Sequence, residues 1–407
     1  MRGLLALLVA TFALSACSVA PDSPAPLARP IVLTTDDDLA LLVSRVTREP
    51  QNEDWTRLRA QADAARVRDF EPEQLADHEA YFAYALKDAK DVRALALAYV
   101  ATANQAYLKA ADRALAAWAR DALLGETPGR DELVGQGLVI GRVMTVFADA
   151  YAILALDLAP DTRDLVERWM RVAVGQIMDS RSFWHSTAML CNESGCGTVT
   201  PPWINGQFSN HLSAQNMGLL ALAYALDDES LVAYAIDSDE NDRDLHDMID
   251  GAILMTTSDA WPGDPSRRSG APDVEPGEMW DRLRIGEGRG LHYAHIQLRF
   301  LTIQALMARN NDEPVDWFAY VGPRGQSLRL AFDYYAEFLI SGDAGSHSGY
   351  YSGDEIDWSM APLYWIAHRE YPDSAPIHGV IASMPTVEDF ETFGWTLALT
   401  RGALRDG

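Results

Sequence analysis

Two short polar clusters in this chain carry side chains suited to acid–base chemistry, and each stands at the start of an apolar helical run. The first is Asn210-His211, which precedes the run LSAQNMGLLALAYAL. The second, GEGRGLHYAHIQLRFL, places Arg289 four residues before Tyr293, so that both side chains share one helical face. A guanidinium beside a phenol favours the phenolate and lowers its pKa. An amide, an imidazole and an activated phenol could neutralise a carboxylate and move a proton.

Each cluster also has a purely structural interpretation. Ser209 or Asn210 suits the N-cap position of the helix that begins near His211. Tyr293 has the character of a half-buried core tyrosine, which packs its ring and exposes its hydroxyl. The pattern His292-x-x-His295 is only a weak metal signal, because no glutamate lies between the two histidines.

Basic residues are scarce in this chain but cluster in one region. The formal net charge of −26 argues against a nucleic-acid partner, since a phosphate backbone requires a basic surface. A local positive patch can nevertheless attract an anionic ligand. The alternative is that these arginines pair with acidic residues of their own loop. The clustered residues are Arg267, Arg268, Arg282, Arg284 and Arg289.

The elements that must position these residues are helices. More than ten runs carry apolar residues at i, i+3, i+4 and i+7, and strand signals are few. Antiparallel helices with short polar links predict an all-α toroid or solenoid. Three long irregular segments, 179–209, 257–288 and 341–357, interrupt this pattern. Because structureless segments of this length are usually functional, we expect them to form a cleft at one end of the domain.

The N-terminus has the pattern of an export signal. Arg2 precedes the apolar run LLALLVATFAL, which is too short to span a membrane. The following LSAC resembles the lipobox of bacterial lipoproteins, which implies cleavage before Cys17 and a lipid on that residue. Ser18 then favours the periplasmic face of the outer membrane or the cell surface. An ordinary secretory signal is the alternative.

These patterns predict three parts of the chain. Residues 1–16 form the signal peptide, residues 17–33 the lipidated cysteine and a Pro/Ala-rich tether, and residues 34–407 one domain. In an exported protein, Cys191 and Cys196 in CNESGCG are best explained as a disulfide. No other segment reaches membrane-spanning length, so we expect membrane attachment only through the N-terminal lipid.

Several motifs, in order along residues 90–370, resemble the alginate-lyase group of polysaccharide lyases. That family has an Asn-His pair opening a helix, matched by Asn210-His211, and a tyrosine in an Arg-x-Leu-x-Tyr context, matched by RGLHY at 289–293. Its C-terminal helix motif is matched by DWSMAPLYW at 357–365, and the earlier AYLKAADRALAAWA is also similar. The resemblance implies an incomplete (α/α) toroid with long loops forming a cleft at one end.

The resemblance also implies an activity. It is β-elimination on an anionic uronic-acid polysaccharide, either alginate or polymannuronate or glucuronan, without a cofactor or metal. The products would carry an unsaturated 4-deoxy uronate end. The implied catalytic residues are Asn210, His211, Tyr293 and Arg289. The residues expected to bind substrate are Trp184, His185, Trp203, Arg284, His292, His295, Trp358 and Tyr364.

The chain departs from the family pattern at three points. The aromatic residues that follow the family's Asn-His pair are replaced by residues 212–214, Leu-Ser-Ala. The family's Tyr-His dipeptide is interrupted by Ala294, and the arginine seven residues before the tyrosine is Gly286. Arg284 and Arg289 are the available substitutes. These differences concern the identity of the sugar more than the type of reaction.

Two other functions fit the same sequence features. A glycoside hydrolase on an (α/α) toroid needs two carboxylates that flank the scissile bond, and Asp281, Glu355 and Asp357 could supply them. A non-catalytic glycan-binding lipoprotein would need the tryptophans and arginines but neither Tyr293 nor His211. Neither alternative explains why both polar clusters occur together after long loops.

Overall fold

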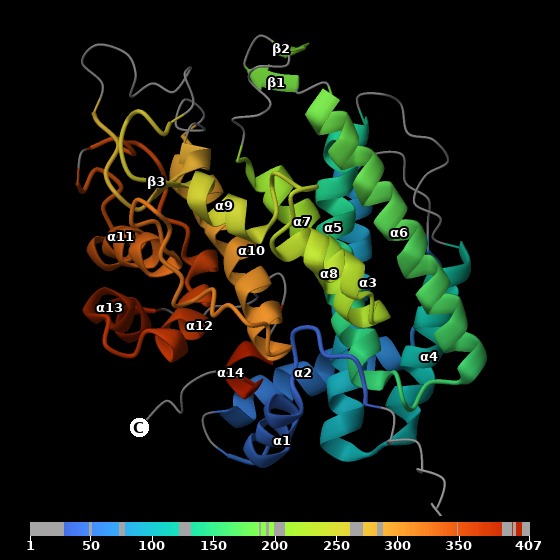
Figure 1. Ribbon diagram of the computed structural model, residues 1–407. Helices are drawn as coiled ribbons and strands as arrows, with labels where there is room; N and C mark the ends of the chain where they lie inside the picture. Colours follow the sequence, from blue (N-terminus) through green and yellow to red (C-terminus); the bar gives the residue numbers. More distant parts are fainter. Residues whose placement is uncertain are drawn as a thin grey trace, which may run out of the picture.

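The computed structural model is all-α, with short strands only at its periphery (Figure 1). The structure describes residues 28–48, 51–72, 78–121, 132–186, 189–192, 195–198, 208–260, 272–282, 288–347, 349–384, 393 and 396–400. The helices are α1 (Asp36–Arg45), α2 (Gln51–Arg66), α3 (His78–Thr102), α4 (Gln105–Asp121), α5 (Glu132–Leu154), α6 (Pro160–Ser186), α7 (Asn210–Leu226), α8 (Glu229–Ile236), α9 (Leu245–Ala252), α10 (Gly290–Asn310), α11 (Leu328–Ser341), α12 (Leu363–Glu370), α13 (Ala375–Ser383) and α14 (Leu397–Thr400).

The core is a row of helices in which α3 packs on α5, α5 on α7, and α7 on α10. In Figure 1, α4 and α6 flank this row on one side and α11, α12 and α13 on the other. The helices thus form an open ring, which confirms the predicted incomplete (α/α) toroid. The apolar run after Asn210 becomes α7, which is buried along nearly all of its length.

Two glycines explain how α5 and α7 approach so closely. A Cβ added at Gly218 would lie 2.3 Å from the Gly141 Cα, and one added at Gly141 would lie 2.3 Å from the Ala214 carbonyl oxygen. Only glycine permits this backbone contact. Within the described residues, α5 alone contains a stretch, Gln136–Leu154, that is long and apolar enough to cross a membrane. That stretch is 89% buried inside the protein, as expected of a core helix.

Two of the segments predicted to be irregular contain regular structure. Helix α6 continues to Ser186, and β1 (Met189–Asn192) and β2 (Gly195–Thr198) follow as an antiparallel hairpin. Its register places Cys191 opposite Cys196. The side chains of this hairpin lie outside the described residues, so the disulfide stays a prediction. In the second segment, β4 (Glu278–Met279) pairs with β3 (Ile253–Leu254).

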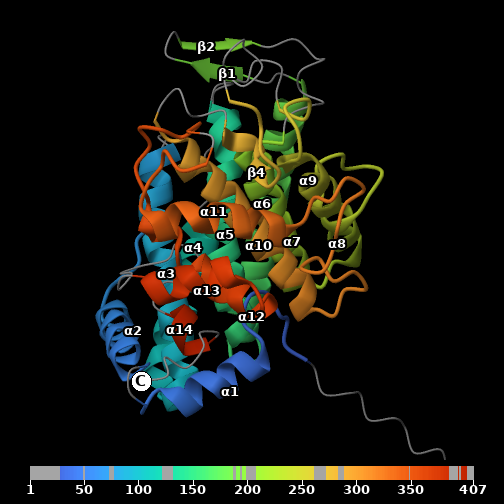
Figure 2. The same ribbon diagram turned by 90° about the vertical axis from the view of Figure 1, so that its left-hand side faces the viewer.

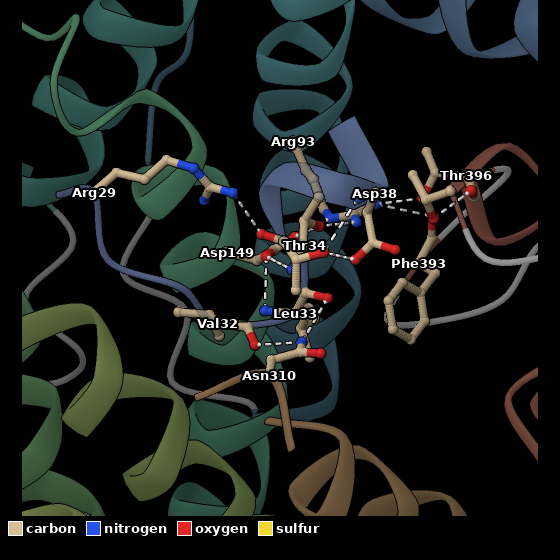
Figure 3. A network of polar contacts seen from close by, with 12 residues as sticks. Arg29, Val32, Leu33, Thr34, Asp38, Arg93, Asp149, Asn310, Phe393 and Thr396 are labelled. Atoms are coloured by element: carbon tan, nitrogen blue, oxygen red, sulfur yellow. Dashed lines mark hydrogen bonds and ion pairs between the residues drawn. The ribbon is translucent and has the colours of Figure 1, made fainter. Parts of the chain in front are cut away.

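The N-terminal segment 28–35, which we call the strap, crosses the end of the molecule opposite the β1–β2 hairpin (Figure 2). Asp149 on α5 accepts hydrogen bonds from the backbone N–H groups of Leu33 and Thr34, both at 2.9 Å (Figure 3). Its other oxygen pairs with Arg93 of α3 at 2.6 Å. Asn310, the last residue of α10, donates to the Leu33 carbonyl at 3.1 Å. The strap is therefore fixed to three helices of the core row.

Candidate active site

The two polar clusters predicted from the sequence lie on neighbouring helices that are joined near their first residues. Helices α7 and α10 pack together, and both begin towards the hairpin end (Figure 1). The Gln297 side-chain amide of α10 donates to the carbonyl of Phe208, just before α7. The Asp281 N–H donates to the Gln297 oxygen at 3.2 Å, while the Asp281 carboxylate accepts from the Asn210 N–H. This chain of contacts fixes one helix start against the other.

Both helix starts are capped by carboxylates from distant loops instead of by their own N-cap residues. Ser209 occupies the N-cap position of α7 but makes no side-chain capping bond, and neither does Arg289 at α10. Asp281 caps α7 through Asn210, and Asp354 accepts from the Leu291 N–H of α10 at 2.8 Å. A carboxylate at a helix N-terminus is favoured by the helix dipole. Since Asp281 caps α7, the side chains of Ser209 and Asn210 are not required as caps at this helix start.

The Asn210 side chain is left for other interactions. Asn210 is only 3% exposed, yet no described residue forms a hydrogen bond with its side-chain amide. A buried amide needs a hydrogen-bond partner, so among the described residues this side chain remains available to a ligand. His211 follows it and is half-buried. The structure thus places an amide and an imidazole side by side at the entrance of α7.

Tyr293 lies one turn before Gln297, near the end of α10 that is joined to the start of α7. Tyr293 and Gln297 are four residues apart, so they lie on the same face of α10, and Gln297 contacts the residue preceding Ser209. Helical side chains also tilt towards the N-terminus, which directs the half-buried Tyr293 to the end where α7 starts. The structure therefore brings Tyr293 and the Asn210-His211 pair onto one side of the α7–α10 junction.

Arg289 does not take the position predicted for it. Its side chain is exposed, and its bond to Tyr293 is made by its backbone carbonyl, at 3.0 Å from the Tyr293 nitrogen. Within the described part of the chain, the guanidinium forms no hydrogen bond or ion pair. Because Arg289 stands at the N-cap position, outside the first helical turn, the i,i+4 contact expected inside a helix is not formed.

A different residue contacts Tyr293. His292 packs its ring edge-on against the Tyr293 ring, with centroids 5.4 Å apart and planes at 82°. The His292 Nδ1 atom lies 2.8 Å from Asp357 Oδ2. The hydrogen bond from His292 holds the pKa of the Asp357 carboxyl well below its usual range. Trp358, half-buried, follows Asp357 and opens the 3₁₀ helix η4 (Trp358–Met360).

Two residues predicted to bind substrate are core residues instead. His295 is 3% exposed, bonds through Nδ1 to the Leu291 carbonyl at 2.9 Å and packs on Tyr335. Burial lowers the pKa of its imidazole to about 4. Tyr364 is fully buried against Phe332. Both lie on the inner faces of their helices, so the prediction that they contact substrate is corrected.

One arginine of the predicted positive patch needs a correction, while Arg267, Arg268 and Arg284 lie outside the described residues. Arg282 is fully buried, pairs with Glu278 and stacks over the Tyr350 ring, 3.4 Å from its centroid, so it is a core residue. Asp281, considered above as a hydrolase carboxylate, is only 2% exposed and is bonded to the start of α7. Its carboxylate therefore has a structural role as the cap of α7.

The remaining predicted residues cannot be placed. Trp184 and His185 belong to the last turn of α6, but their side chains lie outside the described residues. Trp203, Arg284 and Cys17 also lie outside the described residues. Among the residues that are described, no group of three or more His, Cys, Asp or Glu side chains could hold a metal ion.

Sequence reasoning missed three residues that build this site. They are Gln297, which joins α10 to α7, Asp354, which caps α10, and the orienting role of Asp357. A polar residue inside an apolar helical run was the available signal for Gln297. The two aspartates lie in a Gly/Ser-rich loop, and nothing local to them identifies their partners.

Both the sequence and the fold of this chain are similar to those of known proteins. The family model described as alginate lyase matches residues 47–344. Alginate lyase A1-III from Sphingomonas species A1 aligns with a TM-score of 0.56 and 14% identity over 91% of this chain and 97% of its own. An alginate lyase from Bacteroides ovatus aligns with a TM-score of 0.62 and 14% identity over 93% of this chain and 100% of its own. A variant of the Sphingomonas enzyme complexed with a tetrasaccharide aligns equally well, with a TM-score of 0.56 and 14% identity over 92% of this chain and 98% of its own. No curated protein matches the sequence.

Proposed function

The chain belongs to the alginate lyase family and is a polysaccharide lyase, and from this premise we propose that it cleaves a polymer of uronic acids by β-elimination. The substrate is alginate, polymannuronate or glucuronan, and the product carries an unsaturated 4-deoxy uronate end. One observation supports this most directly. Gln297, four residues after Tyr293 on α10, donates to the Phe208 carbonyl just before α7, so the α10 face that carries Tyr293 lies against the helix start that carries Asn210-His211.

The reaction needs three kinds of group, and this junction supplies each. The C5 proton is a poor acid, and its removal builds charge on the adjacent uronate carboxylate. The Asn210 amide, which is hydrogen-bonded to no described residue, can donate to that carboxylate and stabilise the charge. His211 or Tyr293 takes the C5 proton, and Tyr293 protonates the departing O4 oxygen. The C5–H and C4–O4 bonds break, and a C4=C5 bond and an O4–H bond form.

An anionic substrate can approach this site even though the chain is acidic overall. Asp281 and Asp354 each accept from the N–H of a helix start, where the dipole favours negative charge. Asp357 is bonded to the His292 imidazole. These three carboxylates are thus each bonded to a donor, which reduces their repulsion of a uronate.

We also propose that the protein is exported and anchored by a lipid on Cys17, on the periplasmic face of the outer membrane or the cell surface. The LSAC motif supports this, and so does the position of the strap. Asn310, which holds the strap, is 17 residues after Tyr293 on α10, a distance of roughly 25 Å at 1.5 Å per residue. An anchor that leads into the strap would leave the site facing away from the membrane. Loss of radiolabelled fatty acid in Cys17→Ala would support the anchor, and labelling that persists would contradict it.

The activity is tested by incubating the purified protein with alginate, polymannuronate, polyguluronate and glucuronan. β-Elimination leaves a C4=C5 double bond conjugated to the carboxylate, which absorbs ultraviolet light, whereas hydrolysis leaves none. We expect absorbance to rise with one of these polymers. New reducing ends without absorbance would identify the hydrolase, and binding without either product would identify the glycan-binding lipoprotein.

A further inference from the structure

His292 stands beside Tyr293 on the first turn of α10 and is held by a carboxylate from another loop. Its Nδ1 atom is 2.8 Å from Asp357 Oδ2, and the two side chains are 37% and 30% exposed. The imidazole is therefore accessible but not free to rotate. Its edge-on contact with the Tyr293 ring, at 5.4 Å between centroids, also restricts the phenol.

The Asp357 carboxylate fixes which nitrogen of His292 carries the proton. Asp357 stays ionised, because the bond from His292 holds the pKa of its carboxyl far below the usual range. An ionised carboxylate only accepts hydrogen bonds, so Nδ1 must be the protonated nitrogen. In the neutral ring, the lone pair then lies on Nε2. Nε2 bonds to no described residue, which leaves it open as a proton acceptor.

The loop that carries Asp357 is fixed to α10 at two points. Asp354 accepts from the Leu291 N–H at 2.8 Å, and Asp357 accepts from His292. The second oxygen of Asp357 accepts from the Ser359 N–H at 2.9 Å and caps η4. These bonds hold the carboxylate in place before any substrate arrives, as an orienting group in a catalytic dyad must be.

We propose that the Asp357–His292 pair activates Tyr293 by accepting the proton of its phenol, so that the phenolate is the base that removes the C5 proton. This inference rests on the proposed lyase function and decides between Tyr293 and His211 as the base. His292 acts through Tyr293 and is therefore a positioning residue. Asp357 has the role of the acid that orients an imidazole and stabilises its protonated form.

The proton balance closes within the site. The Tyr293 O–H bond breaks and an N–H bond forms at His292 Nε2, through one bridging water, to give a phenolate beside an imidazolium. The phenolate oxygen then takes the C5 proton and becomes a phenol. That phenol donates the same proton to O4 as the C4–O4 bond breaks, which restores the phenolate. His292 keeps its proton throughout, and no co-reactant is required.

The other charged groups around Tyr293 cannot take this part. The Arg289 guanidinium is exposed and contacts no described residue. Asp354 is bonded to the α10 backbone. His295 lies on the buried face of α10, where burial lowers the pKa of its imidazole to about 4 and disfavours a proton. His292, in contrast, joins ring contact with Tyr293 to a carboxylate that can balance the new charge.

A second Asp–His pair in the chain provides a matched control for Asp357–His292. On α9, His246 places Nδ1 3.2 Å from Asp237 and Nε2 2.8 Å from the Tyr320 hydroxyl, and its side chain is 35% exposed. This pair has the same residue types, similar exposure and a tyrosine neighbour, but lies outside the α7–α10 junction. His246→Ala therefore reports what the loss of an Asp-bound histidine does without any catalytic effect.

The experiment measures kcat and KM of full-length variants on the polymer that the wild type cleaves, with and without added imidazole. We expect His292→Ala to lower kcat by about 10²-fold with little change in KM. Imidazole, which fits the space vacated by the side chain, should restore part of that kcat. Asp357→Asn should lower kcat by a smaller factor, because the tautomer is no longer fixed, and imidazole should not restore it. His246→Ala should match the wild type.

Each other outcome overturns the inference in a distinguishable way. Wild-type kcat in His292→Ala would show that His292 is dispensable while the lyase function stands. A loss that imidazole does not restore, or that appears equally in His246→Ala, would assign His292 a structural role. No unsaturated product from the wild type with any uronate polymer would overturn the proposed function and this inference together.

Discussion

The two ends of α10 use the same kinds of polar residue in opposite ways. At its C-terminal end, Asn310 donates to the Val32 and Leu33 carbonyls, close to the buried ion pair between Arg93 and Asp149 (Figure 3). At its N-terminal end, the junction with α7 leaves the Asn210 amide without a partner among the described residues. One end is closed by its own hydrogen bonds, and the other is prepared to bind.

This difference shows where the molecule places stability and where it places function. Asp149 accepts from two backbone N–H groups, a threonine hydroxyl and a guanidinium, so its burial is fully compensated. At the site end, carboxylates satisfy the backbone N–H groups of the helix starts, and the Asn210 amide has no partner among the described residues. Substitutions at the two ends should therefore affect different quantities, namely the free energy of unfolding at the strap and kcat at the junction.

The largest effect should come from the phenol of Tyr293. Tyr293→Phe removes the group that exchanges protons with the substrate, so kcat should fall by about 10³–10⁴-fold. Tyr293 is half-buried, and the change keeps its ring, so the unfolding midpoint should stay that of the wild type. Turnover is measured as the rise in ultraviolet absorbance, and binding by calorimetry with the same polymer.

Tyr364→Phe is the matched control for this change. Tyr364 is fully buried, and its hydroxyl lies 3.4 Å from the Phe332 carbonyl, so its loss should leave kcat unchanged. Near-normal turnover in Tyr293→Phe would remove the phenol from the mechanism. Loss of activity in Tyr364→Phe would show that a fully buried tyrosine is also needed for turnover. Burial would then not distinguish core residues from site residues.

The strap end should respond in stability alone. Asp149→Asn removes the charge that compensates Arg93, which is 2% exposed. Breaking a buried ion pair in this way costs about 3–5 kcal/mol of unfolding free energy, which urea denaturation would measure. The kcat of the folded enzyme should not change.

An exposed ion pair provides the control for Asp149→Asn. Asp373 pairs with Arg329 at 3.0 Å, and its side chain is 70% exposed. Asp373→Asn should leave the urea midpoint unchanged, because solvent screens such a pair. Equal midpoints for the two variants would show that the strap network contributes nothing to stability.

The amide at the site end should have the next largest effect. Asn210→Ala should cost about 3 kcal/mol of transition-state stabilisation, as the loss of an oxyanion-type donor does, seen as a fall in kcat. Asn310→Ala removes the same side chain from the other end of α10, where it bonds the strap. That variant should lose about 1 kcal/mol of stability and keep its kcat. An Asn210→Ala enzyme with unchanged kcat would contradict the role given to the amide.

The sequence predicted the helical fold and both polar clusters, because helix periodicity and helix starts are local signals. The partners of these residues were not predictable in the same way. Asp281 lies 71 residues from Asn210 and Asp357 lies 65 residues from His292, and only packing brings such pairs together. Packing also decides which face of a helix is buried. His295 follows Tyr293 by two residues, a rotation of about 200° around α10, and this carries it from the site into the core.

The smallest effect in this series tests that burial directly through pH. Burial lowers the pKa of the His295 imidazole from 6.5 to about 4. Between these values the unfolded chain binds a proton that the folded protein does not, so His295 destabilises the fold as pH falls through this window. The loss is at most about 3 kcal/mol, reached at the lower end of the window. Asp244 acts in the opposite direction, because burial raises the pKa of its carboxyl to about 6.

The effect of His295 on the free energy of unfolding must therefore be measured as a difference between the wild type and a His295 variant, and not from the wild type alone. The free energy of unfolding of the wild type minus that of His295→Leu should decrease from pH 7 to pH 4 and then level off, since the Asp244 contribution is common to both proteins and cancels. A flat difference for His295→Leu would mean that the imidazole takes up a proton in the folded state. His295 would then be accessible from the site, and its original prediction as a substrate-binding residue would regain support.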